Sequence, residues 1–360
     1  MQGYAFAYPL AAAFGARVAC YTHYPMVSTD MLRAVASRAP SFNNAERVAR
    51  SPLLSAAKLA YYQALAAAYG AAGRCAQVTM VNSTWTADHI RCAAARFVME
   101  GFCSFAHAPA SAHYSELWDV EPELVHPPCD TAALRALPLS RPATPRLVVS
   151  VAQFRPEKAH AMQLRAWAAM RARCASLSGA AAATLASARL VLVGGVRGAE
   201  DAARLEGLRM LAKQLRLEDS VSFLVGVPAA QLRQTLAAAH VGLHTMRDEH
   251  FGISVVEYMA AGAVPLAHDS AGPRMDIVTP RAPGEPRPGR LADSEAGFAA
   301  ALEELLLMPE PQRLQLAAAA REAAAQFSED AFAEGLIAAL RRVLPRGSGA
   351  PGAVPWSKAD

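Results

Sequence analysis

Two glutamates, Glu249 and Glu257, stand eight positions apart and flank a Phe-Gly turn at Phe251 and Gly252. An apolar strand is expected to end just before this segment, at 241–243, and a helix is expected to begin within it. A helix start offers unpaired backbone N–H groups and about half a positive charge, so it attracts anions. Carboxylates accept hydrogen bonds from hydroxyl groups. The spacing therefore suits an anionic, hydroxyl-rich ligand, of which a nucleotide sugar is one example.

Within this segment each residue type favours a different contact. Phe251, Gly252 and Ile253 are expected to seat a diphosphate, because glycine lets a backbone approach a phosphate closely. Glu257 falls more than one turn into the expected helix, where its carboxylate suits a ribose. Glu249 precedes the helix and is expected to face the sugar. One alternative stays open for Glu249, since an acid near a helix start also stabilises the helix itself.

Two cations follow another expected strand, at 146–151. Arg155 and Lys158 come soon after this continuous apolar run, which is typical of a buried parallel sheet. Ligands bind at the carboxyl ends of such strands, so these cations and Glu249 are expected to meet at one edge of the sheet. There they would stabilise a leaving diphosphate. The alternative is that 155–158 form a solvated turn.

His23 belongs to an earlier strand end. It follows a strand expected at 17–21 and precedes Tyr24 and Pro25, which places it on the rim of a first domain. If the rims of two domains face each other, His23 points into the cleft between them. The alternative is a turn histidine with a structural role.

Strands alternate with helices along the chain, and this alternation positions the polar residues. Strands are expected at 17–21, 76–81, 146–151, 189–195, 221–224 and 241–244, and helices at 52–69, 160–174, 201–215 and 229–239. Such alternation predicts a right-handed, doubly wound α/β sheet. Length and pattern predict two domains, at 1–140 and 145–342. Low-complexity residues 180–186 and the Pro- and Gly-rich residues 279–290 are expected to be loops, and 346–360 a disordered tail.

Composition excludes several classes of protein. The chain has 360 residues, of which 53% are hydrophobic, and a net charge of only +4. It lacks the Lys/Arg-rich block that nucleic-acid binding favours. No signal peptide is recognisable at the start, and no run of about 20 apolar residues predicts a spanning helix. The cysteines are scattered without a C-x-x-C pair, which predicts reduced thiols and no zinc site: Cys20, Cys75, Cys92, Cys103, Cys129 and Cys174.

The glutamate pair with its Phe-Gly turn resembles the donor-site signature of the retaining GT-B glycosyltransferases of family four. Other segments resemble one group within that family, the eukaryotic GDP-mannose-dependent α-1,2-mannosyltransferases of dolichol-linked oligosaccharide assembly. The resemblance runs from about residue 3 to residue 332. The segments that carry it are CYTHYP at 20–25, STDML at 28–32, VNSTWT at 81–86, SVAQFRPEKAH at 150–160, DEHFGISVVEYMAAG at 248–262 and HDSAGPRMDIV at 268–278.

This resemblance implies a GT-B fold, in which two Rossmann-like domains face a cleft. Residues 1–140 would be part of the acceptor-side domain, and 145–342 the domain that binds the GDP-sugar. The implied reaction transfers mannose from GDP-mannose with retention, adding the fourth and fifth mannoses to a dolichyl-diphosphate oligosaccharide that carries three. It would take place on the cytosolic face of the endoplasmic reticulum membrane, without a metal or other cofactor. A membrane surface and other mannosyltransferases of the pathway are the implied partners.

The resemblance also implies a role for each site residue. The catalytic set would be His23 beside the transferred sugar, Glu249 on the mannose hydroxyls and Lys158 on the diphosphate. Glu257 would hold the ribose, and the loop at 270–272 would lie near the donor phosphates. The full donor-binding set is Arg155, Lys158, Phe251, Gly252, Ile253, Glu257, Ser270, Ala271 and Gly272.

Two departures from the family pattern have consequences. Many family members carry an arginine five residues before the phosphate-binding lysine, where this chain has Gln153. The family also has an N-terminal membrane segment and a glycine-rich loop, whereas residues 4–8 already resemble the middle of the first domain. We therefore expect an incomplete first domain, with the helix at 52–72 either at the membrane interface or buried. Alternatives are a catalytically impaired nucleotide-sugar-binding fragment or scaffold, and a GDP-sugar hydrolase.

Overall fold

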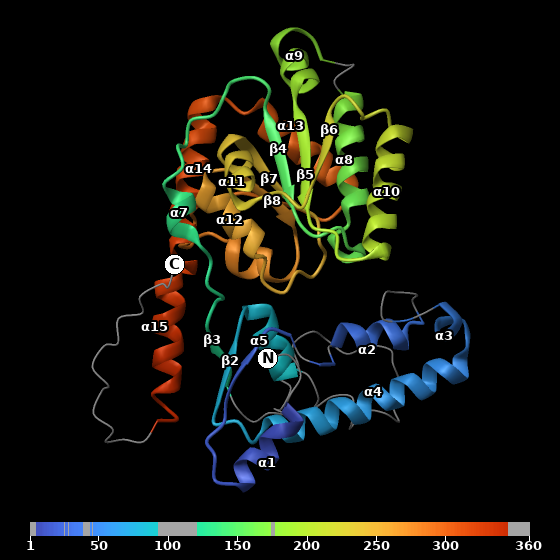
Figure 1. Cartoon of the computed structure of the whole chain (residues 1–360), viewed down its shortest axis with the longest axis vertical. Coiled ribbons are helices and arrows are strands. Elements are labelled where there is room, and N and C mark those ends of the chain that lie inside the picture. The colour runs from blue at the N-terminus through green and yellow to red at the C-terminus, as the bar shows by residue number, and fades with distance from the viewer. Residues whose placement is uncertain are drawn as a thin grey trace. The chain divides into compact units, whose positions relative to one another are not determined.

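The computed structural model describes residues 5–24, 26–27, 29–38, 44, 46–92, 121–173 and 177–344. The chain forms two compact units (Figure 1). Unit 1 comprises residues 1–82, 86–125 and 333–360, and unit 2 comprises residues 83–85 and 126–332. These limits differ from the expected 1–140 and 145–342, mainly because the end of the chain belongs with unit 1. There Arg342 forms an ion pair with Glu123, and Arg17 donates a hydrogen bond to the carbonyl of Val343 at 2.8 Å.

Unit 2 is built on a six-stranded sheet in the order β6-β5-β4-β7-β8-β9. All of its strand pairs are parallel. The strands are β4 (Leu147–Val151), β5 (Arg189–Gly194), β6 (Val221–Val225), β7 (Ala239–His244), β8 (Val264–His268) and β9 (Arg290–Ala292). Counted along the chain within this sheet, the order is 3-2-1-4-5-6, which is the doubly wound arrangement of dinucleotide-binding folds. The expected doubly wound sheet is confirmed.

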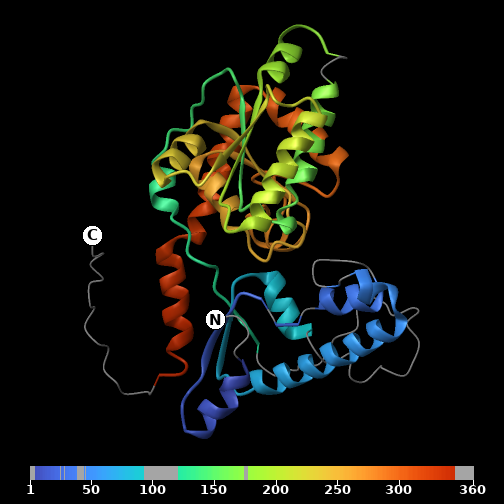
Figure 2. The same ribbon diagram turned by 45° about the vertical axis from the view of Figure 1, so that its right-hand side comes forward.

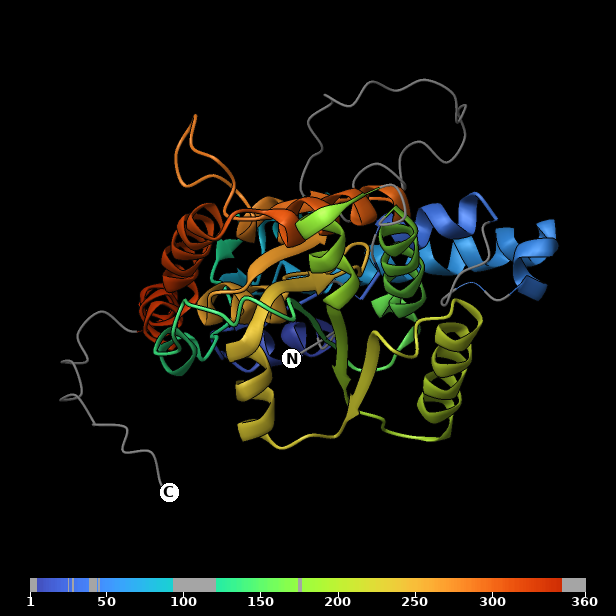
Figure 3. The ribbon, with the colours of Figure 1, turned by 90° about the horizontal axis from the view of Figure 1, so that it is seen from above.

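Helices cover both faces of this sheet (Figure 3). Successive strand residues face opposite sides, so Val148 joins one core cluster and Val149 the other. The first cluster contains residues of α8 (His160–Arg173), α10 (Ala199–Gln214) and α13 (Glu295–Leu307), and the second contains residues of α7 (Thr131–Arg135), α11 (Ala229–Ala238), α12 (Ile253–Ala261) and α14 (Glu310–Ala324). Because both faces are buried, the strands read as continuous apolar runs in the sequence.

Two glycines let the site-bearing segments approach the sheet. A Cβ atom on Gly242 of β7 would lie 2.1 Å from the ring of Tyr258. Tyr258 is fully buried, and its hydroxyl accepts a hydrogen bond from the N–H of Val151 at 2.6 Å. A Cβ atom on Gly194 would lie 2.1 Å from the carbonyl oxygen of Ala152. Glycine therefore fixes how α12 and the segment after β4 seat against the strands.

Unit 1 contains a small parallel sheet in the order β1-β2-β3. Figure 2 shows α4 as its long helix, with α2 and α3 beside it. Ser51 caps α4, because its hydroxyl accepts a hydrogen bond from the N–H of Leu54 at 3.3 Å, and Pro52 occupies the first helical position, which suits proline. The elements are η1 (Ala5–Ala7), α1 (Tyr8–Ala13), β1 (Ala19–Thr22), α2 (Thr29–Ala36), α3 (Glu46–Arg50), α4 (Pro52–Gly73), β2 (Val78–Val81), α5 (Thr84–Cys92) and β3 (Glu123–Leu124).

Several expectations need correction or extension. Residues 180–186 are not a loop, because they lie within helix α9 (Gly179–Ser187), where alanine is a strong helix former and Leu185 is fully buried. The loop expected at 279–290 is confirmed up to the start of β9 at Arg290. The tail at 346–360, Cys103 and Cys174 lie outside the described residues. Elements that the sequence did not reveal are η1, α1, α2, α3, β3, α7, η2 (Pro156–Lys158), β8, η4 (Pro273–Ile277), β9, α13, α14, η5 (Ala325–Phe327) and α15 (Glu329–Leu340).

Within the described ranges, no helix combines the length and the apolar character that a bilayer crossing requires.

Candidate active site

The order of the sheet in unit 2 reverses between β4 and β7, and ligands of doubly wound folds bind at that point. Lys158 follows β4 and Glu249 follows β7. Their side chains meet, since the Nζ atom of Lys158 lies 2.5 Å from Oε2 of Glu249. The expected meeting of the two residues at one edge is therefore confirmed. Their roles toward a ligand stay predictions.

Lys158 is held by the end of β7. It closes the single turn η2, after which Ala159 adopts a left-handed conformation with φ of 52°. The hydroxyl of Thr245 donates to the carbonyl of Lys158 at 3.0 Å, and Gln163 of α8 donates to that same hydroxyl at 2.9 Å. Thr245 and Gln163 are buried and were not predicted as site residues. They join the two loops that carry the ion pair.

The Glu249 loop is braced by the segment after β8. The N–H of Asp248 donates to the hydroxyl of Ser270 at 2.8 Å, and the N–H of Gly272 donates to the carbonyl of Glu249 at 3.0 Å. A Cβ atom on Gly272 would lie 2.4 Å from the carbonyl oxygen of Phe251, so only glycine fits there. Ser270, Ala271 and Gly272 thus shape the loop that carries Glu249. As donor contacts they stay predictions.

Backbone strain concentrates around the same edge. Five described residues other than glycine have positive φ angles, and three of them, Ala159, Asp248 and Ala271, lie in these loops. Left-handed geometry costs a non-glycine residue on the order of 1–3 kcal/mol, and strained residues cluster at functional sites. The strain supports the assignment of this edge as the site.

His244, the last residue of β7, completes the charge arrangement around Glu249. Its Nε2 atom lies 3.2 Å from the same Oε2 atom that Lys158 contacts, without the alignment of a good hydrogen bond. Burial by itself raises the pKa of Glu249, but the His244 and Lys158 contacts outweigh it and lower that pKa to about 2. Glu249 is therefore a fixed carboxylate, with its side chain only 16% exposed.

Helix α12 begins beside this pair with the features of an anion seat. Gly252 has a φ of 112° and no side chain caps the helix start. No backbone carbonyl among the described residues accepts from the N–H groups of Gly252, Ile253 or Ser254. Phe251 is 3% exposed, and its ring stacks on His126 and packs edge-on against Phe327. Its ring anchors the turn, so only its backbone is available to a ligand.

Glu257 lies one helical turn beyond the α12 start and is half-buried. Burial raises the pKa of Glu257, and the charge of Asp130 raises it further. No cation pairs with its carboxylate in the described part of the chain. That carboxylate is therefore open to hydroxyl donors, as the predicted ribose contact requires.

Arg155 does not pair with Glu249, and His23 belongs to the other unit. The guanidinium of Arg155 lies 3.9 Å from Oε1 of Glu157, and its side chain is 39% exposed. His23 lies at the end of β1 in unit 1, where its ring packs edge-on against Tyr21 at 4.8 Å between centroids. The catalytic role of His23 and the phosphate role of Arg155 stay predictions.

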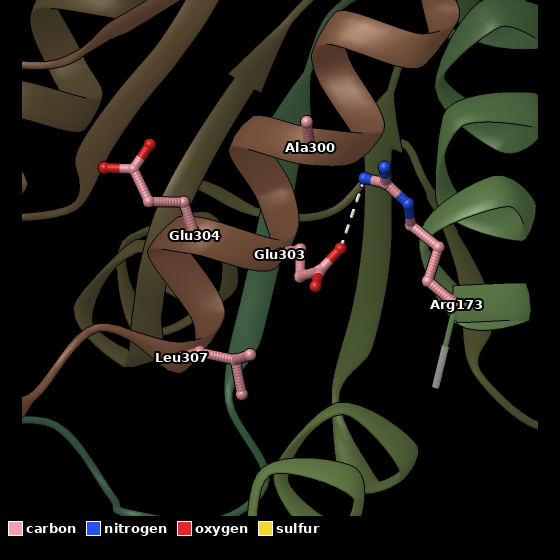
Figure 4. Close-up of a pocket in the computed structure, with 5 residues that line it drawn as sticks. All are labelled: Arg173, Ala300, Glu303, Glu304 and Leu307. Carbon is pink, nitrogen blue, oxygen red and sulfur yellow. Dashed lines mark hydrogen bonds and ion pairs between the residues drawn. The ribbon is translucent and has the colours of Figure 1, made fainter. Parts of the chain in front are cut away.

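A separate pocket of about 530 Å³ lies between α8 and α13 and does not belong to this site (Figure 4). Arg146 at the start of β4 donates to the carbonyl of Met308 just after α13, so the pocket lies at the opposite end of the strands. Its charges are paired, because Arg173 contacts Glu303 at 3.2 Å and Arg290 contacts Glu304 at 2.6 Å. The lining residues are Arg173, Ala300, Glu303, Glu304 and Leu307.

The Glu249 ion pair predicts a pH-dependent contribution to stability. The folded-state pKa of Glu249 is lowered from an ordinary value of 4.5 to about 2, so its contribution is present above pH 4.5 and is lost as pH falls toward 2. We expect Glu249→Gln to lower the free energy of unfolding at pH 7, and we expect this difference from wild type to shrink as the pH falls from about 5 to about 3. Denaturant titrations of both proteins at about pH 7 and about pH 3 measure the difference. The exposed pair of Glu206 and Arg209 supplies the control variant Glu206→Gln, for which we expect little change at either pH.

Known protein families match both parts of the chain. Residues 138–323, which contain the site, match the family described as glycosyl transferases group 1, and residues 1–93 match the family described as ALG11 mannosyltransferase N-terminus. A mouse protein named GDP-Man:Man(3)GlcNAc(2)-PP-Dol alpha-1,2-mannosyltransferase is 40% identical over 95% of this chain and 64% of its own length. A Dictyostelium discoideum protein of the same name is 36% identical over 95% of this chain and 63% of its own length.

Solved structures of low sequence identity share the fold. A UDP-forming trehalose-phosphate synthase from Burkholderia xenovorans has a TM-score of 0.65 and 13% identity over 94% of this chain and 72% of its own. Sucrose-phosphate synthase from Thermosynechococcus elongatus has a TM-score of 0.60 and 18% identity over 94% of this chain and 77% of its own. These likenesses confirm the predicted GT-B class. With a family match over more than half of its length, the chain belongs to the glycosyl transferases group 1 family.

Proposed function

We propose that this protein transfers mannose from GDP-mannose, with retention, to a dolichyl-diphosphate oligosaccharide that carries three mannoses, adding the fourth and fifth in α-1,2 linkage. The observation that carries the proposal is the Lys158–Glu249 pair at the switch point of the sheet, beside an uncapped helix start. The names of the mouse and Dictyostelium relatives support this donor and acceptor. The chain spans less than two thirds of their length, 64% and 63%, so the transfer reaction is a proposal for this chain.

The proposal gives each group of the site a separate role. The α12 start and Lys158 bind the diphosphate and stabilise its charge as it leaves. Glu249 accepts hydrogen bonds from the mannose hydroxyls, and Glu257 accepts those of the ribose. The bond between mannose C1 and the GDP phosphate breaks, and a bond from C1 to the acceptor oxygen forms. The proton of the acceptor hydroxyl leaves with the phosphate.

The test is transfer by the 360-residue chain from GDP-mannose to a lipid-linked acceptor with three mannoses. Addition of two mannoses that an α-1,2-mannosidase removes supports the proposal, and running the assay in EDTA tests our proposal that no metal is needed. Mannose release without acceptor would indicate a hydrolase. GDP-mannose binding without turnover would indicate a nucleotide-sugar-binding protein. Absence of GDP-mannose binding would show that the proposed donor site is wrong.

We further propose that unit 1 meets a membrane surface, which the reaction would require on the cytosolic face of the endoplasmic reticulum. Leu10 and Phe14 are one helical turn apart at α1 and are 64% and 84% exposed. Residues 1–92 carry eight Lys/Arg and three Asp/Glu, which is a net charge of +5, whereas the whole chain has a net charge of +4. Apolar side chains together with excess positive charge favour an anionic interface. Helix α4 contributes Leu53, which is 79% exposed, but buries Tyr69.

The double variant Leu10→Ser/Phe14→Ser is expected to lower binding to anionic vesicles by about tenfold or more, since each side chain would bury apolar surface worth on the order of 1.5 kcal/mol. Vesicle sedimentation at low and high salt measures the bound fraction. Met210→Ser in unit 2, where Met210 is 50% exposed, is the matched control and should bind like wild type. Equal binding by the double variant and wild type would remove α1 from the proposed surface.

A further inference from the structure

His244 occupies an unusual place for a polar side chain. It ends β7, a strand in the middle of the sheet whose residues are all buried, and it is itself 3% exposed. Its ring lies between two elements of the site. The Nε2 atom is 3.2 Å from Oε2 of Glu249, and the Nδ1 atom is 3.4 Å from the hydroxyl of Ser254 near the start of α12.

This arrangement is not explained by stability alone. The Nε2 atom is buried beside Oε2 of Glu249 but is not aligned for a good hydrogen bond, so its hydrogen-bonding capacity is not fully used in the folded state. Lys158 meanwhile occupies the same Glu249 oxygen at 2.5 Å. Two nitrogen atoms thus contact one carboxylate oxygen, and the lysine holds the shorter contact. His244 is the second contact of that oxygen.

We infer that His244 is a positioning residue, which holds the Glu249 carboxylate toward the sugar of the donor. The inference rests on the proposed function. Glu249 must keep one orientation to contact the sugar hydroxyls, and Lys158 alone does not fix it, because the proposed ligand of that lysine is the diphosphate. The His244 ring is the second contact of the carboxylate, and Ser254 contacts that ring at the opposite nitrogen. Glu249 then stays aimed at the sugar hydroxyls.

The test compares how tightly GDP and GDP-mannose bind, since Glu249 is proposed to contact only the sugar. We expect His244→Leu to weaken GDP-mannose binding by about tenfold, the effect of losing one charge-assisted contact, while GDP binding changes by less than about twofold. Titration calorimetry on the whole chain measures both. His244→Gln places an amide nitrogen where Nε2 lies and should restore most of the difference. Equal weakening of both ligands, or no change for either, would overturn the inference.

A milder variant covers the case in which His244→Leu does not fold. Ser254→Ala removes the contact to Nδ1, and the hydroxyl of Tyr258 that Ser254 also contacts keeps the N–H of Val151, so we expect GDP-mannose binding to weaken by about threefold with GDP unchanged. Unchanged binding of both ligands would count against the inference. Glu249→Gln separates the two hypotheses. If Glu249→Gln still prefers GDP-mannose over GDP as wild type does, the proposed sugar contact of Glu249 is wrong. If Glu249→Gln loses that preference but the His244 and Ser254 variants keep it, the sugar contact stands and only the role of His244 is wrong.

Discussion

Lys158→Ala is expected to lower kcat/KM for mannose transfer by about 10²–10³-fold, the effect of removing one group that stabilises charge in a transition state. Two losses combine. The leaving diphosphate loses its cation, and the Glu249 carboxylate, with its side chain 16% exposed, keeps only the poorly aligned His244 contact. Initial-rate kinetics with varied GDP-mannose measure the effect, and most of it should appear in kcat.

Two control variants define what a loss at Lys158 means. Lys213→Ala removes an exposed lysine from the last turn of α10 and should transfer mannose at the wild-type rate. Arg155→Ala tests the second predicted cation, whose 39% exposed side chain contacts Glu157 at 3.9 Å rather than Glu249, so we expect a smaller loss. A Lys158→Ala enzyme with normal kcat/KM would show that the proposed donor site is wrong.

The part of the site that could be predicted depends on buried strands. Strand β4 and the 241–243 part of β7 appear in the sequence as apolar runs, because both faces of a parallel sheet are covered. The polar residues that follow such runs then fall at one edge, and this rule places Lys158 and Glu249 at the same edge. The sequence did not reveal the strand order that makes β4 and β7 neighbours. Parallel strands far apart in sequence leave no local sign of their pairing.

The missed residues share a different cause. His244 and Thr245 end a strand, and whether such a side chain points toward the site depends on the position at which the strand stops. Applying the edge rule to every polar residue at the end of β7 would have found both. Phe251 was assigned to ligand contact from its motif, but its ring is taken up by His126 and Phe327. Only tertiary packing decides between those uses.

Element limits failed where composition and tertiary contact disagreed with local signals. The alanine run at 180–186 was interpreted as low complexity, although the same residues have high helix propensity and Leu185 supplies a buried anchor. The domain limit expected at 140–145 was placed just before the apolar run of β4, which is a strong local signal. The return of the chain end to unit 1, by contrast, depends on the Arg342–Glu123 ion pair and similar long-range contacts that have no local signal.

Gly242→Ala is expected to lower the free energy of unfolding of unit 2 by about 3 kcal/mol, the upper end for an overpacked core. The added Cβ atom would lie 2.1 Å from Cγ and 2.5 Å from Cβ of Tyr258. Tyr258 cannot retreat easily, because it is fully buried and its hydroxyl accepts the N–H of Val151 at 2.6 Å. Any shift of α12 also displaces the helix start that the proposed donor needs. Urea titration and GDP binding measure the two consequences.

The cause can be separated from a general effect of alanine at a glycine. Gly207 lies inside α10 with open space around the position of a Cβ atom, so Gly207→Ala should stabilise unit 2 by up to about 1 kcal/mol. A Tyr258→Gly background removes the Cβ, Cγ and Cδ2 atoms that the added Cβ atom would meet, and Gly242→Ala should then cost less than about 1 kcal/mol. If Gly242→Ala cost the same with and without the Tyr258 ring, close packing of α12 on β7 would not be the reason for glycine at this position.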